Sequence, residues 1–298
     1  TAIENGVSPC DMYPNELIKY PQYKDWEPKN SDYIYGGEFS VWGALAASIN
    51  TVTVQLMEKV GLPEIINLVK KMGIETEHPE VPSLALGTAE LSLLEMVRAY
   101  TTFPNYGKPM HEVAIIKIVN REGIFLNILP IKNTKKVYSE KTGEVMVEML
   151  KRVVVNGISA PLRYDFQLFG DVAGKTGTTQ SQADGWFIGF TSNLVTGAWV
   201  GAENPSIHFK TMELGQASHT ALPINGEFLR MLNKDVSFQY YLKEDFRKPS
   251  KDILKLFDCS SRKNVPKPVV KDTIAEIILD SLTIENVEII KDSVTVQQ

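Results

Sequence analysis

Residues 174–179 carry the most chemistry in this chain of 298 residues, because Lys175 lies between two glycines and is followed by three threonines. The small side chains leave the backbone open to a neighbour, the hydroxyls can bind an anion, and the lysine supplies one positive charge. The alternating aromatic residues of 186–190 predict that this segment is a strand entering a hairpin. A ligand with a carboxylate and a peptide-like backbone fits these groups best.

Three interpretations of the lysine segment differ in the structure that each requires. A phosphate-binding loop needs a glycine five residues before Gly174 and must open a helix, whereas that position is Phe169 and the segment continues as strand. A surface lysine in a Gly/Thr-rich strand, without function, is a second interpretation. The third is an edge strand that binds a substrate backbone by strand addition, with Gly177 permitting close approach.

A second polar group, Ser48 and Asn50, interrupts an otherwise apolar helical pattern. Serine and asparagine compete with the helix backbone for hydrogen bonds, so a polar break between two helices is predicted here. A Ser-x-Asn triplet also arises by chance in a chain of this size. The break is therefore either a plain turn or a site that projects a hydroxyl and an amide into a cleft.

Hydrophobic periodicity indicates the elements that position these residues. Helices are predicted over 40–60, 63–72, 92–102, 140–155 and 216–233, a hairpin over 111–129, and strands over 171–179, 185–191 and 195–201. Residues 8–39 have no sustained period, residues 1–6 resemble the last turn of a helix ending at Gly6, and the pattern fades after about residue 236. This order predicts an α+β fold in which a helical part packs beside an antiparallel sheet.

Composition limits the partners. The net charge of −5, without a basic stripe, argues against nucleic acid as a partner. No apolar run approaches the length of a membrane span. The four histidines lack metal-ligand spacing, so neither a metal nor another cofactor is predicted, and Cys10 and Cys259 either pair or stay free.

The two polar motifs together are typical of penicillin-binding proteins and class A β-lactamases. Five stretches resemble class A, bifunctional penicillin-binding proteins in particular: residues 44–52, 82–88 with 94–95 after them, 172–179, 184–191 and 194–201. The resemblance covers roughly residues 1–232. It implies the transpeptidase fold shared with serine β-lactamases and the cross-linking of peptidoglycan stem peptides of the D-Ala-D-Ala type, with β-lactams trapping the enzyme.

The resemblance also implies roles for single residues. The catalytic residues would be Lys175, which anchors the electrostatics of the cleft, Ser48, which relays a proton to the leaving group, and Asn50, which bonds the substrate's peptide amide. Thr176, Gly177, Thr178 and Thr179 would bind substrate, with the hydroxyls of Thr176 and Thr178 on its carboxylate. The backbone N–H of Thr178 would form half of an oxyanion hole.

The chain departs from the family at the nucleophile, which the family places in a Ser-x-x-Lys motif upstream of the other two motifs. The one such motif here, residues 260–263, follows them. We therefore expect the chain to be a piece truncated upstream of Thr1, with residues 1–235 a partial transpeptidase domain, 236–298 an extension of unknown role, and no covalent activity of its own. The upstream glycosyltransferase domain and membrane anchor would place the intact protein on the periplasmic face of the inner membrane.

Two other functions stay open. One is a non-catalytic module that binds peptides or β-lactams. The other is a β-lactamase, which the stretch at residues 82–88 disfavours.

Overall fold

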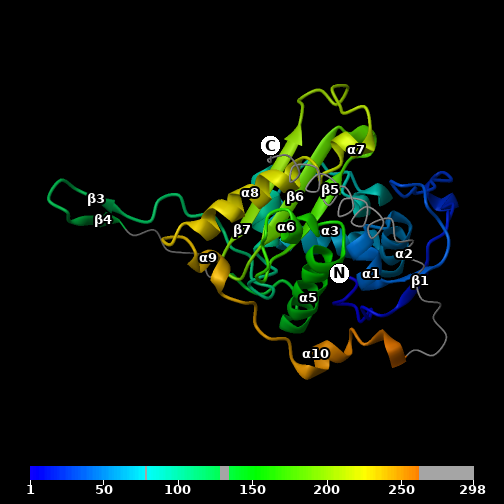
Figure 1. Ribbon diagram of the computed structural model, residues 1–298, viewed down its shortest axis with the longest axis horizontal. Helices are drawn as coiled ribbons and strands as arrows, with labels where there is room; N and C mark the ends of the chain where they lie inside the picture. Colours follow the sequence, from blue (N-terminus) through cyan, green and yellow to red (C-terminus); the bar gives the residue numbers. More distant parts are fainter. Residues whose placement is uncertain (78, 128–133, 262–298) are drawn as a thin grey trace, which may run out of the picture. The chain divides into compact units, whose positions relative to one another are not determined.

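The computed structural model describes residues 1–77, 79–127 and 134–261. These residues fall in one compact unit, in which helices cover both faces of a three-stranded sheet (Figure 1). The sheet consists of β5 (Ala173–Thr178), β6 (Asp184–Phe190) and β7 (Val195–Gly201), antiparallel and in that spatial order. The α+β fold and the three consecutive strands predicted from the sequence are thus confirmed.

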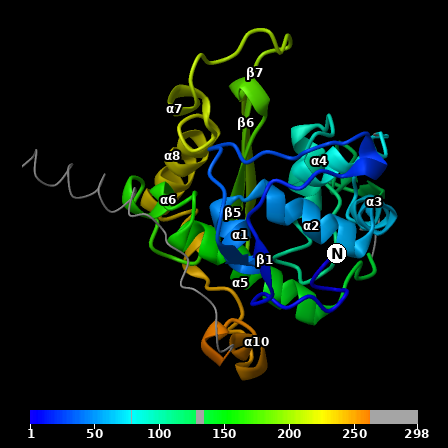
Figure 2. The same cartoon turned by 90° about the vertical axis from the view of Figure 1, so that its right-hand side faces the viewer.

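The two faces of the sheet pack against different helices. Phe187 is fully buried on one face, where it joins a cluster with Leu222 and Leu229 of α8 (Ala221–Lys234). Phe190 points to the opposite face and packs in a cluster with Leu150 of α5 (Glu140–Asn156). In Figure 2, α8 lies to the left of the strands and α5 lies below them. This alternation follows from the period of two in a strand.

The helical part is built from α1 (Val41–Ala47), α2 (Asn50–Val60), α3 (Leu62–Lys71) and α4 (Leu93–Tyr100). The predicted helix over 40–60 is broken at Ser48 and Ile49, as the polar triplet indicated. The predicted capping box of α4 is present, because Ser92 and Glu95 bond each other's backbone. In α8 the helix starts later than predicted, and Pro223 lies in its first turn, where a missing N–H is tolerated.

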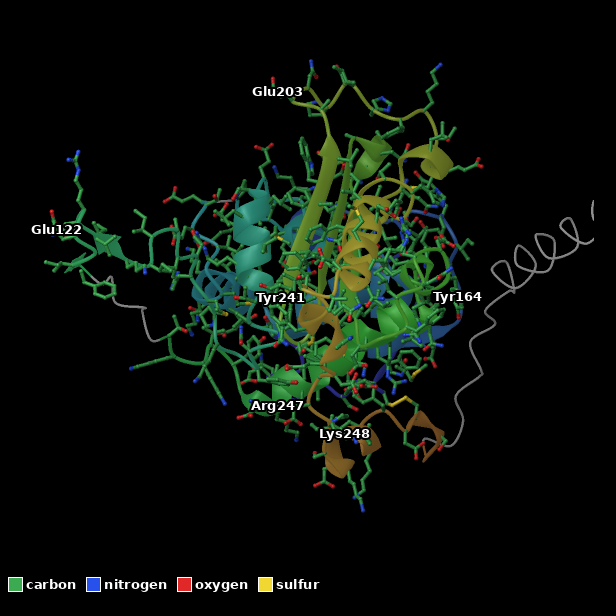
Figure 3. All side chains as sticks on the ribbon, turned by 60° about the vertical axis from the view of Figure 1, so that its left-hand side comes forward. Glu122, Tyr164, Glu203, Tyr241, Arg247 and Lys248 are labelled. Atoms are coloured by element: carbon green, nitrogen blue, oxygen red, sulfur yellow. A yellow bond between two sulfur atoms is a disulfide. The ribbon has the colours of Figure 1, made fainter. Side chains whose placement is uncertain are left out.

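The other elements are short. They are β1 (Met12–Pro14) paired with β2 (Glu38–Ser40), β3 (Ile118–Val119) paired with β4 (Phe125–Asn127), the helices α6 (Pro161–Tyr164), α7 (Met212–Gly215), α9 (Tyr240–Lys243) and α10 (Lys251–Lys255), and the 3₁₀ turns Pro21–Tyr23, Pro82–Leu86, Gln180–Gln182 and Cys259–Ser261. The predicted hairpin at 111–129 is confirmed as β3 and β4, although residues 128 and 129 lie outside the described ones. Figure 3 shows it extending outward, with Glu122 near its tip.

Residues 236–261 pack against the same cores as the sheet and helices. Phe246 lies 5.5 Å from Phe190 between ring centres, and Phe257 is buried in a cluster with Val41 of α1. Cys10 and Cys259 form a disulfide, drawn in yellow in Figure 3, so the pairing left open by the sequence is resolved. The predicted extension 236–298 is described only up to residue 261.

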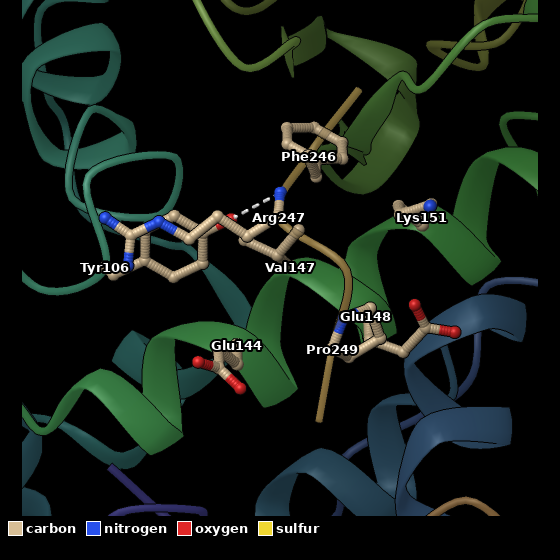
Figure 4. A pocket seen from close by; sticks show the side chains of 8 residues that line it. All are labelled: Tyr106, Glu144, Val147, Glu148, Lys151, Phe246, Arg247 and Pro249. Carbon is tan, nitrogen blue, oxygen red and sulfur yellow. Dashed lines mark hydrogen bonds between the residues drawn. The ribbon is translucent and has the colours of Figure 1, made fainter. Parts of the chain in front are cut away.

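The small cavity of Figure 4 belongs to this C-terminal packing. It lies between α5 and residues 246–249, and the Arg247 N–H donates to the Tyr106 hydroxyl at its wall over 3.2 Å. Its volume of ≈ 10 Å³ has room for about one water molecule. The cavity arises where residues 246–249 cross α5. No residue of the predicted site lines it.

Ser48 has a left-handed backbone, with φ 57° and ψ 48°. The Ser48 N–H donates to the Leu45 carbonyl and the Ile49 N–H to the Ala44 carbonyl, a pattern that ends helices and usually has glycine at this position. A residue with a Cβ is disfavoured here by about 1–2 kcal/mol. Backbone strain of this kind persists where the surroundings hold it, and it is found preferentially at functional sites.

The disulfide generates the first prediction. Cys259→Ser should lower the free energy of unfolding by about 3–5 kcal/mol, because the bond joins residues 249 apart and restricts the unfolded chain. Urea unfolding under oxidising conditions measures the effect, and the neighbouring Ser260→Ala serves as a control expected to match the wild type. Equal unfolding midpoints for the wild type and Cys259→Ser would show that the bond does not constrain the chain.

The strained backbone generates a second prediction, from a pair of variants that both lack the Ser48 hydroxyl. Ser48→Gly should be more stable than Ser48→Ala by about 0.5–1 kcal/mol, since glycine escapes the left-handed penalty but loses more entropy on folding. Thermal and urea unfolding of the two variants test it. A Ser48→Ala protein as stable as Ser48→Gly would mean that this backbone is not left-handed.

Candidate active site

The predicted motif residues Lys175 and Ser48 meet in the structure, although 127 residues separate them. The Lys175 ammonium donates to the Ser48 hydroxyl oxygen at 2.9 Å and to the carbonyl oxygen of Thr176 at 2.9 Å. Strand β5 supplies the lysine, and the break between α1 and α2 supplies the serine. Lys175 lies opposite Ile188 in the register, so it points to the face of the sheet that carries Phe190 and the α5 contacts.

Burial lowers the pKa of the Lys175 ammonium to about 8, from an ordinary value of about 10.4. Roughly a tenth of the amine is then neutral at pH 7, and half at pH 8. The group can therefore supply a positive charge and also exchange a proton near neutral pH. Because the folded chain binds fewer protons than the unfolded chain between pH 8 and about 10.4, this lysine makes folding more favourable as the pH rises through that window.

Thr176 and Thr178 point to the opposite face of β5 from Lys175. Thr176 is 8% exposed and lies opposite Phe187. The Thr178 hydroxyl accepts a hydrogen bond from the Ala217 N–H at 2.9 Å, which fixes it beside the turn that precedes α8. A Cβ at Gly185, the residue paired with Thr178, would lie 2.3 Å from the Thr220 hydroxyl, so this hydroxyl packs directly against the glycine.

Strand β5 is an edge strand of the sheet formed by the described residues. Its edge opposite β6 therefore offers backbone groups to an extended ligand. Gly177 lies in this strand, and Thr179 follows it. The Thr179 hydroxyl accepts from the Asp184 N–H at 2.9 Å and so closes the turn between β5 and β6 rather than lying open to a ligand.

Asn50 is the first residue of α2, two positions after Ser48. Its side-chain amide donates to the Lys29 carbonyl at 2.8 Å. The side-chain oxygen and the second amide N–H then remain for another partner. The structure thus brings Ser48 and Lys175 into direct contact and places Asn50 on the same break.

Three polar residues that the sequence did not single out lie behind this break. Asn15, Asn30 and Thr51 are each at most 3% exposed and hydrogen-bond one another. Asn15 and Asn30 belong to the aperiodic stretch at residues 8–39, where no pattern separates a structural asparagine from a surface one. The one signal in the sequence was the position of Thr51, directly after Asn50 in the polar break.

The Ser-x-x-Lys serine, Ser260, lies apart from this site. It is exposed, hydrogen-bonds Asp258, and follows the disulfide cysteine Cys259. Figures 1 and 2 both place the preceding helix α10 away from β5. No group of metal-binding side chains occurs in the described part of the chain. Within the residues that the structure describes, no helix is long and apolar enough to cross a membrane.

Comparison with known proteins identifies the family of this chain. The family model described as penicillin binding protein transpeptidase domain matches residues 1–204. Penicillin-binding protein 1A of Aquifex aeolicus (strain VF5) is 36% identical over 231 residues, which are 78% of this chain and 30% of the relative. The chain therefore spans less than a third of that protein.

Two solved structures share the fold. Penicillin-binding protein 1A from Haemophilus influenzae has a TM-score of 0.73 at 24% identity, covering 84% of this chain and 41% of the other. PonA1 from Mycobacterium tuberculosis in complex with penicillin V has a TM-score of 0.67 at 21% identity, covering 84% and 69%. With the family model matching more than half of its length, the chain belongs to the penicillin-binding protein transpeptidase family.

Proposed function

We propose that this chain forms the Lys-Thr-Gly and Ser-x-Asn side of a D,D-transpeptidase that cross-links peptidoglycan stem peptides ending in D-Ala-D-Ala. The observation that carries the proposal is the 2.9 Å hydrogen bond from the Lys175 amine to the Ser48 hydroxyl. A lysine with a pKa of about 8 and a hydroxyl beside it form a short path for a proton. Membership of the family supports the same reaction.

The proposed reaction is acyl transfer through a serine ester. The oxygen of a nucleophilic serine bonds to the carbonyl carbon of the penultimate D-alanine, and the bond from that carbon to the terminal D-alanine nitrogen breaks. The serine proton passes to the departing amine, with Ser48 and Lys175 as its relay. The amine of a second stem peptide then attacks the ester carbon, the bond from that carbon to the serine oxygen breaks, and a proton of the amine returns to the serine as the cross-link forms.

The remaining residues hold the substrate. The extended stem peptide adds to the open edge of β5, where Gly177 permits a close approach. The Thr178 hydroxyl binds the terminal carboxylate, and the Lys175 charge favours it. We assign Thr176 to the packing of the sheet, since its side chain is buried on the face that carries Phe187. Asn50 bonds a peptide amide, and the Thr178 N–H stabilises the oxyanion. We assign Thr179 to the turn beside this edge, since its hydroxyl already bonds the Asp184 N–H.

The nucleophile, in this proposal, is not among residues 1–298. Ser260 has the required sequence spacing but is exposed, bonds Asp258, and follows a disulfide cysteine. The full-length protein would supply the serine, together with the glycosyltransferase domain and membrane anchor that place it at the periplasmic face of the inner membrane. The chain alone would bind peptides or β-lactams without forming an acyl-enzyme, which is the second candidate function.

Incubation with a fluorescent penicillin, followed by intact-mass measurement, tests the proposal. The full-length protein should gain one penicillin per molecule, whereas residues 1–298 alone should gain none. Lys175→Ala and Ser48→Ala in the full-length protein should slow acylation by roughly a hundredfold or more, the scale of lost proton transfer.

Ser260→Ala provides the matched control, because it removes a serine hydroxyl away from β5 and should leave the acylation rate unchanged. A covalent adduct on residues 1–298 alone would contradict the external nucleophile. A full-length protein that is acylated at the same rate with and without the Lys175 amine would contradict the proposed site.

A further inference from the structure

The first turn of α2 lacks a local cap. Its N-cap residue, Ile49, has no side chain that can accept a hydrogen bond, and the first N–H groups of a helix have no partner within the helix. The acceptor comes instead from a residue distant in sequence. The Asn30 side-chain oxygen accepts from the Asn50 N–H at 3.0 Å and from the Thr51 N–H at 3.3 Å.

The side-chain amide of Asn30 is also hydrogen-bonded, to two acceptors away from α2. Its amide donates to the Asn15 side-chain oxygen at 2.7 Å and to the Ile34 carbonyl at 2.8 Å. The same Asn15 oxygen accepts from the Thr51 hydroxyl at 2.8 Å. Buried polar networks whose members are all bonded are rigid, because every alternative arrangement leaves a desolvated group without a partner.

The residue before Asn30 fixes the side chain of Asn50. The Lys29 carbonyl accepts one amide N–H of Asn50, while Asn30 holds the Asn50 backbone. Two adjacent residues therefore determine both where α2 starts and how the Asn50 amide points. Ser48, two positions earlier, is held upstream by the last turn of α1 and downstream by the start of α2, so its left-handed backbone depends on this second anchor.

We propose that Asn30 is a positioning residue, which caps α2 from a distant loop and thereby fixes Asn50 and the Ser48 hydroxyl in the geometry that acyl transfer needs. The inference rests on the proposed function. It predicts that the loop containing Lys29 and Asn30 controls the rate of acylation without touching the reacting atoms. Small displacements of such groups lower rates strongly, up to about a hundredfold per ångström.

Two variants of the full-length protein separate a positioning role of Asn30 from an effect on stability alone. Asn30→Ala removes the acceptor of both N–H groups. Thr51→Val removes the hydroxyl bond to Asn15 and leaves the cap in place, so it is the control for damage to the network alone.

Acylation by a fluorescent penicillin should slow about ten- to a hundredfold in Asn30→Ala. The maximal rate should fall, while the penicillin concentration that gives half of it should stay unchanged. Thr51→Val should stay within about threefold of the wild type even if its unfolding midpoint falls. Asn30→Ala no slower than Thr51→Val would overturn the inference.

Amide hydrogen exchange in the same proteins gives a readout that does not require activity. Exchange at Asn50 and Thr51 should rise on the order of tenfold in Asn30→Ala, the scale of a lost cap, while the amides of β6 keep their protection. Unchanged exchange at both residues would overturn the cap. Absence of acylation in the wild type would instead contradict the proposed function, and the exchange measurement would still decide whether Asn30 caps α2.

Discussion

A lysine amine that is partly withdrawn from water needs oxygen partners, and this requirement organises the candidate site. Lys175 finds them in the Ser48 hydroxyl and the Thr176 carbonyl, at 2.9 Å each. Both partners must stay in place, because a buried charge without them is strongly disfavoured. The sheet, which fixes β5, and the packing of α1 on α5, which fixes Ser48, are therefore both conditions for the lysine's lowered pKa.

Of the two residues in this contact, Ser48 has the less favourable backbone conformation. Ser48 has a backbone conformation that glycine adopts more readily, so its hydroxyl is available only while both neighbouring helices hold it. The end of α1 does so through its own carbonyls. The start of α2 does so through Asn30, which connects the site to the irregular segment before β2.

The sequence predicted the helices and strands whose hydrophobic residues recur with a regular period. The strands, α5 and the capping box at Ser92 followed from local spacing, as did the polar break at Ser48. The contact between Ser48 and Lys175 came from the family resemblance, since no local pattern relates residues 127 apart. Asn15 and Asn30 were not predictable, because their role depends on burial and long-range hydrogen bonds within an aperiodic segment. The packing of Phe246 and Phe257 was missed for the same reason.

The pH titration of the Lys175 side chain, followed by NMR on its ¹⁵N-labelled amine, tests the central claim most directly. Loss of one resonance in Lys175→Arg would assign the signal. Our account predicts a midpoint at about pH 8, because burial against Ser48 disfavours the charged form. A midpoint near pH 10.4, the value of a hydrated lysine, would show that the amine does not lie in this environment and would contradict the account.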